Sequence, residues 1–401
     1  KKIVFMKVGI LFEGSPMNPG GFNQSLISTL ILNEIIEFRD NFTFITLDES
    51  SNHLLLEKNL NVIIYKNNFF SKILNRLYSI DYLKKLFDKL NIKHSFTKFL
   101  NKNNFEIIIF LSPHQLSLYC LDVNFVINIW DIDHKKSPYP EHHINNTFEK
   151  RENFLNYVLF KSFKIIVAHE QIKNDLVKLY KCNPDKILVQ SFISYLPYVA
   201  NKKIKQNNSK LLSYQIPFHK KILFYPATFW PHKNHKYIID AAIILKKKSI
   251  NNFHFLFCGS DRGNFDFIKN EIEKNELNKL FTIIPFASNE EVIFFYENVF
   301  GVVMPTTGGP TNLPLYESFF FKKPIFYTKD LLNDENLKKA IIEIDIKDPI
   351  DFVNKLLNID NLDLDKIKSY AYDYYLKVCD KEIYKKNYKS ILKDFELALS
   401  N

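Results

Sequence analysis

Short runs of consecutive apolar residues alternate along the chain with longer stretches in which apolar residues recur every three or four positions. The run Lys7–Phe12 (KVGILF) is typical of a strand buried on both faces, whereas Phe22–Phe38 has the period of a helix. The alternation predicts βαβ units and parallel sheets, and therefore an α/β fold. The other predicted strands are Phe105–Leu111, Phe125–Trp130, Lys164–Ala168, Lys186–Phe192, Lys221–Tyr225, Phe253–Cys258, Phe281–Ile284, Val302–Met304 and Pro324–Tyr327.

A polar, basic stretch without a clear period separates the two halves of the chain. We interpret residues 201–217 as a linker between an N-terminal domain (1–200) and a C-terminal domain (218–375). The length of 401 residues accommodates two domains of ordinary size. The end of the chain has a helical pattern throughout, and residues 376–401 are predicted to form a separate C-terminal helix.

The charge of the chain favours some partners over others. Lys and Arg number 54 and Asp and Glu 44, which gives a formal net charge of +10. This excess suits an anionic small molecule or an anionic membrane surface, and the scattered basic pairs argue against nucleic acid. The four cysteines stand far apart, so neither a zinc site nor a disulfide framework is expected. Without a signal-peptide pattern or a long apolar run, we expect a cytoplasmic protein.

Only nine glycines occur in the chain, which suggests that those present are needed by the backbone. They cluster in an N-terminal loop, in a loop after Phe257 and in a loop after Met304. Each of these loops follows a predicted strand. In an open parallel sheet, ligands bind outside the carboxyl ends of the strands, so the glycine loops are candidate binding segments.

The segment after Met304 (MPTTGGPTNLPLYE) is the strongest candidate. Its Gly308-Gly309 pair precedes a predicted helix, with Thr311 or Asn312 as the cap and Pro314 in the first turn. Free amides at a helix start, beside glycines that allow close approach, are typical of an anion site. Glu317, one turn into the helix, could accept two sugar hydroxyls. A tight strand-to-helix turn with an exposed glutamate is the alternative.

Two further loops of the second half carry candidate phosphate contacts. Lys233 and His235 follow the strand in LFYPATFWPHKNH, and a lysine there can hold a diphosphate as a point charge. Arg262, in FCGSDRGN, is a second candidate phosphate contact. A solvated lysine, a packing histidine and a plain glycine turn are the alternatives.

The first half carries a glycine loop and a charged loop. Gly20 and Gly21 end the loop after the first strand, where the backbone could approach phosphates. The segment WDIDHKKSPYPE contributes Asp131, Asp133, His134 and Glu141 just after a strand, and this cluster suits acid–base work or hydroxyl binding. Metal binding is a rival, although the spacing fits no standard site, and a charged loop without chemistry is the other alternative.

These motifs together resemble the GT-B glycosyltransferases of the glycosyltransferase 4 type ("group 1"). The resemblance rests on MPTTGGPTNLPLYESF, FYPATFWPHKNH and FCGSDRGN, with WDIDHKKSPYPEHH, the following FEKRE and VAHEQIKNDLVKLY in the first half. It implies two Rossmann-like, doubly wound parallel-sheet domains facing a cleft, with a C-terminal helix that crosses back to the first domain. It also implies a nucleotide-sugar donor bound mainly to the C-terminal domain, and neither a metal nor another cofactor.

The resemblance assigns roles to residues of this chain. The implied donor contacts are Gly20, Gly21, Lys233, His235, Arg262, Gly308, Gly309, Pro310, Thr311, Asn312, Leu313 and Glu317, of which Lys233 would bind the diphosphate and Glu317 the ribose. The implied acceptor side comprises Asp131, His134, Glu141 and Arg151, and catalysis would rest on Lys233, Glu317, Asp131 and His134. The chain departs from the family at Gly309, Thr228 and Trp130, where relatives carry a glutamate, an arginine and a histidine.

The resemblance therefore predicts a retaining hexosyltransferase that acts on a sugar or lipid-linked acceptor in bacterial surface polysaccharide or lipopolysaccharide assembly, with peripheral contact to the inner membrane leaflet. A nucleotide-sugar epimerase or phosphorylase of the same fold is one alternative. A non-enzymatic basic protein that binds membrane or nucleic acid is another. Neither the donor base and sugar nor the acceptor follows from the residues.

Overall fold

The computed structural model describes residues 6–14, 19–67, 69–78, 81–136, 143–200, 214–309, 312–329, 331 and 334–400. The chain divides into two compact units. The first unit comprises Lys1–Ile132, Asn146–Ile193 and Lys381–Asn401, and the second comprises Asp133–Asn145 and Ser194–Asp380. The C-terminal segment therefore returns to the first unit, as the resemblance implies. Most of the predicted linker, residues 201–213, lies outside the described residues.

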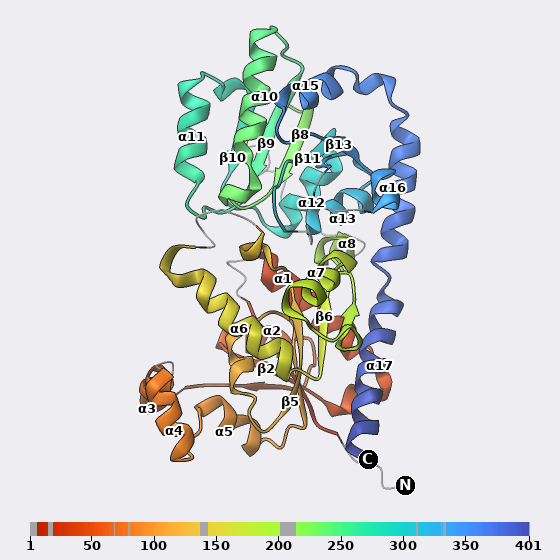
Figure 1. The fold of residues 1–401 in the computed structure, drawn as a ribbon. Coiled ribbons are helices and arrows are strands. Elements are labelled where there is room, and N and C mark those ends of the chain that lie inside the picture. Colours follow the sequence, from red (N-terminus) through yellow and green to blue (C-terminus); the bar gives the residue numbers. More distant parts are fainter. Residues whose placement is uncertain are drawn as a thin grey trace. The chain divides into compact units, whose positions relative to one another are not determined.

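The described residues of the first unit form a seven-stranded parallel sheet in the order β3-β2-β1-β4-β5-β6-β7. Figure 1 labels β2, β5 and β6 of this sheet and the helices beside them. Its first strand is central: Val8 lies opposite Phe42 on one side and Ile107 on the other. Both faces of this strand are buried, as its unbroken apolar run predicts. The strands are β1 (Val8–Leu11), β2 (Phe42–Thr46), β3 (Val62–Ile64), β4 (Ile107–Phe110), β5 (Asn124–Ile129), β6 (Lys164–Val167) and β7 (Ile187–Val189).

Helices connect these strands, and the last helix of the chain joins them. The helix α17 packs on α1. Its Lys381 donates to the carboxylate of Glu34, directly after α1, and its Asn387 donates to the side chain of Gln190, directly after β7. The helices of this unit are α1 (Pro19–Asn33), α2 (Glu49–Leu56), α3 (Phe69–Tyr78), α4 (Asp81–Lys89), α5 (Ser95–Lys102), α6 (Thr147–Lys161), α7 (Glu170–Tyr180) and α17 (Lys381–Ser400).

The described residues of the second unit form a six-stranded parallel sheet in the order β10-β9-β8-β11-β12-β13. The chain runs outward from β8 to β10, returns to the centre at β11 and then runs outward on the other side. Because parallel crossovers are right-handed, this reversal places helices on both faces of the sheet. The strands are β8 (Lys221–Pro226), β9 (Phe253–Cys258), β10 (Phe281–Ile284), β11 (Gly301–Met304), β12 (Ile325–Thr328) and β13 (Ile342–Ile344).

Local sequence signals begin several helices of this unit. Ser288 and Glu291 form a reciprocal capping box before α12, and Asp348 caps α15, whose first residue is Pro349. The helices are α8 (Tyr195–Ala200), α10 (His235–Lys247), α11 (Phe265–Lys274), α12 (Asn289–Asn298), α13 (Leu313–Phe320), α14 (Glu335–Lys338), α15 (Pro349–Leu357) and α16 (Leu364–Val378). Among the described residues, no helix is both long enough and apolar enough to cross a membrane.

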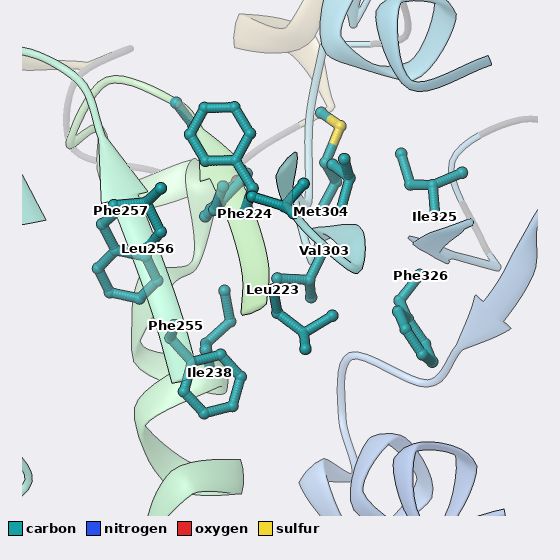
Figure 2. Close-up of a cluster of buried hydrophobic side chains, with 14 of the residues drawn as sticks. Leu223, Phe224, Ile238, Phe255, Leu256, Phe257, Val303, Met304, Ile325 and Phe326 are labelled. Atoms are coloured by element: carbon teal, nitrogen blue, oxygen red, sulfur yellow. The ribbon is translucent and has the colours of Figure 1, made fainter. Parts of the chain in front are cut away.

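The core of the second unit lies against its four central strands. Figure 2 shows Phe224 and Phe257 from β8 and β9 and Met304 from β11 in one buried cluster with their neighbours. Phe224 and Phe257 are fully buried and Met304 is almost so. This packing fixes where β8 and β11 end, and therefore where the loops that follow them begin.

One glycine of the predicted loops is needed for packing. A Cβ atom on Gly259 would lie 2.2 Å from the carbonyl oxygen of Ala227, because the loops after β8 and β9 run against each other. The amide of Phe229 donates to the carbonyl of Ser260 at 2.9 Å across the same contact. Gly263 differs, since its φ is +95° and nothing lies within 4 Å of a Cβ built there.

We expect Gly259→Ala to destabilise the protein more than Gly263→Ala. The first change forces backbone apart and should cost about 3 kcal/mol, whereas the second meets only an unfavourable φ that costs about 1–2 kcal/mol. Thermal unfolding of both variants beside the native protein measures the difference. Equal midpoints for the two variants would contradict the close approach at Gly259.

Candidate functional site

The candidate site lies at the point where the second sheet changes direction. β8 and β11 are neighbours, with Gly301 opposite Leu223, but their connections leave toward opposite sides of the sheet. Such a reversal leaves the carboxyl ends of two central strands uncovered, and this is where open α/β sheets bind ligands. The loops that follow these two strands carry Lys233 and the Gly308-Gly309 pair.

Hydrogen bonds hold the two loops against each other. The carbonyl of His232 accepts from the Thr307 amide at 2.9 Å and from the Thr307 hydroxyl at 3.1 Å. The hydroxyl of the buried Thr306 donates to the carbonyl of Gly308 at 2.8 Å. These bonds fix the backbone on both sides of the glycine pair, so the loops have a defined separation before any ligand arrives.

Lys233 is held at both ends. Its carbonyl accepts from the hydroxyl of Tyr225 at 2.6 Å, and its Nζ donates to Oδ1 of Asn312 at 3.1 Å. The residue lies at the end of the short turn Pro231–Lys233 and is half-buried. The ammonium therefore points at the start of α13 from the neighbouring loop, and the sequence prediction that these two segments meet is confirmed by this bond.

Asn312 organises the start of α13 in an unexpected way. We expected Thr311 or Asn312 to cap this helix, but Asn312 makes no side-chain cap bond. Its Nδ2 instead donates to the hydroxyl of Tyr327 at 2.9 Å and to the carbonyl of Gly309. Because its Oδ1 accepts from Lys233, this buried amide orients the lysine and the glycine loop together. Leu313 is the first residue of the helix, and Pro310 and Thr311 lie outside the described residues.

A carboxylate already occupies one amide of the glycine loop. The N–H of Gly309, whose φ of 77° suits glycine, donates to Oδ2 of Asp133. A Cβ on Gly308 would lie 2.9 Å from the same oxygen, so the close approach depends on that glycine. Asp133 belongs to the charged cluster predicted from the sequence, but the roles implied by the resemblance went to its neighbours Asp131 and His134. The alternation of acidic residues in WDIDH was the available signal.

Glu317 is buried and engaged by hydroxyl groups. Its Oε1 accepts from Ser194 at 2.6 Å and its Oε2 from Tyr296 at 2.8 Å. Burial raises the pKa of Glu317, while the two hydroxyl donors oppose that shift. The alternative of an exposed glutamate is therefore wrong. The carboxylate accepts two hydroxyl groups, and both come from the protein.

His235 is a core residue in the structure. Its ring is fully buried, stacks on Phe229 with centroids 4.5 Å apart and lies 4.7 Å from the ring of Tyr225. Burial lowers its pKa to about 3, so the ring is neutral at physiological pH. The structure thus gives His235 a packing role and places its ring inside the unit, away from the loop surface. Arg262 lies in the exposed turn after β9.

The predicted residues of the first half belong to different parts of the structure. Gly20 and Gly21 lie in the first turn of α1, which begins at Pro19, so the expected glycine loop ends earlier than predicted. In the first unit, Asp131 accepts from Arg151 at 2.6 Å, which brings together two of the predicted acceptor residues. The others are His134, which is buried within the second unit, and Glu141, which lies outside the described residues.

Comparison with known proteins identifies the part of the chain that carries the site. Residues 210–373 match the family described as glycosyl transferases group 1. The matched part of the chain includes the loops of Lys233 and Gly309, together with Glu317, so the resemblance seen in the sequence is confirmed where the candidate site lies. No curated protein matches the sequence.

Solved structures share the fold over almost the whole chain. HepE of Anabaena, in complex with UDP-glucose, is 15% identical with a TM-score of 0.70, over 97% of this chain and all of that chain. A glycosyltransferase from Rickettsia africae is 17% identical with a TM-score of 0.68, over 97% of this chain and 99% of that chain. Sucrose-phosphate synthase from Thermosynechococcus elongatus is 13% identical with a TM-score of 0.70, over 98% of this chain and 100% of that chain. The fold class is therefore GT-B, as predicted.

The burial of His235 predicts how the stability of the protein depends on pH. Below about pH 6.5 the unfolded chain protonates this histidine, whereas the folded protein does not until about pH 3, so stability falls as the pH falls. At pH 4.5 the penalty is roughly 3 kcal/mol. His235→Phe keeps the aromatic stack and removes the proton, so we expect a smaller loss of thermal stability between pH 7 and pH 4.5.

The exposed His53 supplies the matched control, because His53→Phe should leave the acid sensitivity unchanged. Thermal unfolding at both pH values measures the effect. If His235→Phe were as acid-sensitive as the native protein, the buried, neutral state of this histidine would be contradicted.

Proposed function

We propose that the protein is a glycosyltransferase that takes its sugar from a nucleoside diphosphate sugar. One observation carries the proposal: the Nζ of Lys233, the side chain of Asn312 and the N–H of Gly309 converge where β8 and β11 end, within the part of the chain that matches group 1 glycosyl transferases. A fixed ammonium and a backbone amide beside glycine are suited to a diphosphate. The complex of HepE with UDP-glucose supports a nucleotide-sugar donor.

The chemical role of Lys233 follows from the charge that develops during transfer. As the bond between the anomeric carbon and the phosphate oxygen breaks, the diphosphate gains negative charge. Groups that are already positioned toward this charge lower the barrier because they need no reorganisation. Asn312 holds the lysine in place before the reaction, so the ammonium is available at the moment the charge appears. On this account the site requires no metal ion.

Asp133 gives the site a further property. Its carboxylate accepts the hydrogen bond of the Gly309 amide. A diphosphate that bound the same amide would have to displace this carboxylate, because two anions at one donor repel each other. The carboxylate shows that the amide can hold an oxyanion. We propose that Asp133 leaves the amide when the donor binds and is then available to accept a sugar hydroxyl.

Glu317 fits the proposed ribose contact in its chemistry. A carboxylate that accepts two hydroxyl groups from Ser194 and Tyr296 could exchange one of them for a ribose hydroxyl of the same kind. The exchange would preserve the number of hydrogen bonds to a buried carboxylate, which matters because an unpaired buried charge is costly. This role rests on the resemblance and on the position of Glu317 one turn into α13.

The finer parts of the proposal concern the reaction and its setting. We propose a hexose donor and retention of the anomeric configuration. In this reaction the acceptor oxygen bonds to the anomeric carbon on the face that the phosphate leaves, and the departing phosphate takes the acceptor proton. The acceptor would be a sugar or a lipid-linked glycan in bacterial surface polysaccharide or lipopolysaccharide assembly. The resemblance to group 1 glycosyltransferases supports these statements.

Lys233→Ala tests the proposal. A thermal-shift screen of UDP, GDP, ADP and TDP should identify one nucleotide that stabilises the native protein, by about 2.7 kcal/mol at a hundredfold excess over the dissociation constant. The variant should lose most of this stabilisation. Its rate of nucleoside diphosphate release from the matching nucleotide sugar should fall at least about 100-fold, because the developing charge loses its ammonium.

Lys236→Ala is the matched control, since Lys236 lies one turn away on α10 and pairs with Asp240. It should keep native binding and turnover. If Lys233→Ala retained near-native nucleotide stabilisation and turnover, or if none of the four diphosphates stabilised the native protein, the proposed function would be contradicted.

A further inference from the structure

Ser194 is the buried residue at which the segment Ser194–Asp380 of the second unit begins. It lies just before α8, in neither a helix nor a strand, and it is only 2% exposed. Its hydroxyl donates to Oε1 of Glu317 at 2.6 Å, a distance typical of the strong hydrogen bonds that carboxylates accept from hydroxyl groups. Ser194 therefore supplies one of the two protein donors that the buried carboxylate has.

The other donor, Tyr296, is fixed by its packing. Tyr296 belongs to α12 and is fully buried. Its ring stacks on that of Phe321 with centroids 5.0 Å apart and meets the ring of Phe224 edge-on at 5.2 Å. To withdraw its hydroxyl, the whole ring would have to move within a close-packed core. The hydroxyl of Ser194 can leave by rotation about a single side-chain bond, so Ser194 is the donor that can be exchanged.

An exchangeable donor changes how a buried carboxylate recognises a ligand. A site that binds a hydroxyl of its substrate normally rejects an analogue without that hydroxyl, because a buried polar group of the protein is then left unpaired. Serine and ribose carry the same kind of aliphatic hydroxyl group. If Ser194 can return to Glu317 whenever no ribose hydroxyl is present, the carboxylate keeps its partner and this penalty disappears.

We infer that the hydroxyl of Ser194 is an internal competitor of the ribose. It occupies Oε1 of Glu317 in the free protein and gives up this place to a ribose hydroxyl when the nucleoside diphosphate binds. The inference rests on the proposed function and deepens it. One hydrogen bond replaces another, so the ribose adds little to the affinity, and Ser194 limits how tightly the nucleoside diphosphate product is held.

Titration calorimetry of the full chain tests the inference with two ligands: the nucleoside diphosphate that stabilises the native protein, and its dideoxy analogue, which lacks the ribose hydroxyls. In the native protein the two dissociation constants should differ by less than about threefold, because Ser194 serves Glu317 when the analogue binds. Ser194→Ala should bind the nucleoside diphosphate at least about fivefold more tightly than the native protein, and should bind the analogue at least about tenfold more weakly than the nucleoside diphosphate.

Tyr296→Phe is the matched control, because it removes the other hydroxyl donor from the same carboxylate and keeps the aromatic ring. Ser194 remains available for exchange in this variant, so the ratio of the two dissociation constants should stay close to the native ratio. The native ratio itself tests the inference without any substitution, and therefore does not depend on whether Ser194→Ala folds.

Several results would overturn the inference while the proposed function stands. Weaker or unchanged binding of the nucleoside diphosphate by Ser194→Ala would show that Ser194 only positions Glu317. A native preference over the analogue as large as that of Ser194→Ala would show that no exchange takes place. A tighter complex with Tyr296→Phe in place of Ser194→Ala would make Tyr296 the competitor. If the native protein bound no nucleoside diphosphate, the proposed function and the inference would fail together.

Discussion

The reversal of strand order between β8 and β11 is the constraint on which the candidate site depends. Two adjacent parallel strands end together, and the chain leaves them toward opposite sides of the sheet, so no connection covers their carboxyl ends. The aromatic core beneath keeps both strands in register. A lysine from one loop and an amide from the other can then face each other without any change in the backbone. Positioning of this kind is what electrostatic catalysis requires.

Acceptor oxygens from the protein stabilise this arrangement. An ammonium and a backbone N–H that share one small volume would be unfavourable if both lacked acceptors. Asn312 supplies an oxygen to Lys233, and Asp133 supplies one to Gly309. Both acceptors are polar side chains that a more highly charged diphosphate could replace. The site is therefore satisfied when empty and needs little rearrangement to bind an anion.

The sequence predicts a strand well where it is an unbroken apolar run, and poorly where the strand is very short or carries polar residues. β1, β4 and β8 are unbroken apolar runs, and the structure has strands there. β2 was missed because polar Thr43 and Thr46 interrupt it, although both side chains are buried. β3 and β13 have three residues each, too few to show a period. A strand of this length is stabilised by pairing with its neighbour, which the local sequence does not report.

Those residues of the site that follow closely after a strand in the sequence could be predicted. The glycine pair, the lysine and the helix start each follow a strand, so the sequence indicates that they share an edge of the sheet. The burial of His235 depends on Phe257 of β9 as well as on its own loop, and the packing demand at Gly259 depends on Ala227 after β8. No local pattern reveals contacts between strands that lie far apart in the sequence. The position of Asp133 depends on a long-range contact with Gly309, which only the folded chain provides.

A crystal structure of the protein with the nucleoside diphosphate that stabilises it most is the most direct measurement of the central claim. The account predicts phosphate oxygens within hydrogen-bonding distance of the Nζ of Lys233 and of the Gly309 amide, with the Asp133 carboxylate displaced from that amide. A diphosphate bound elsewhere on the second unit, with Asp133 still bonded to Gly309 and Lys233 still bonded to Asn312, would contradict it.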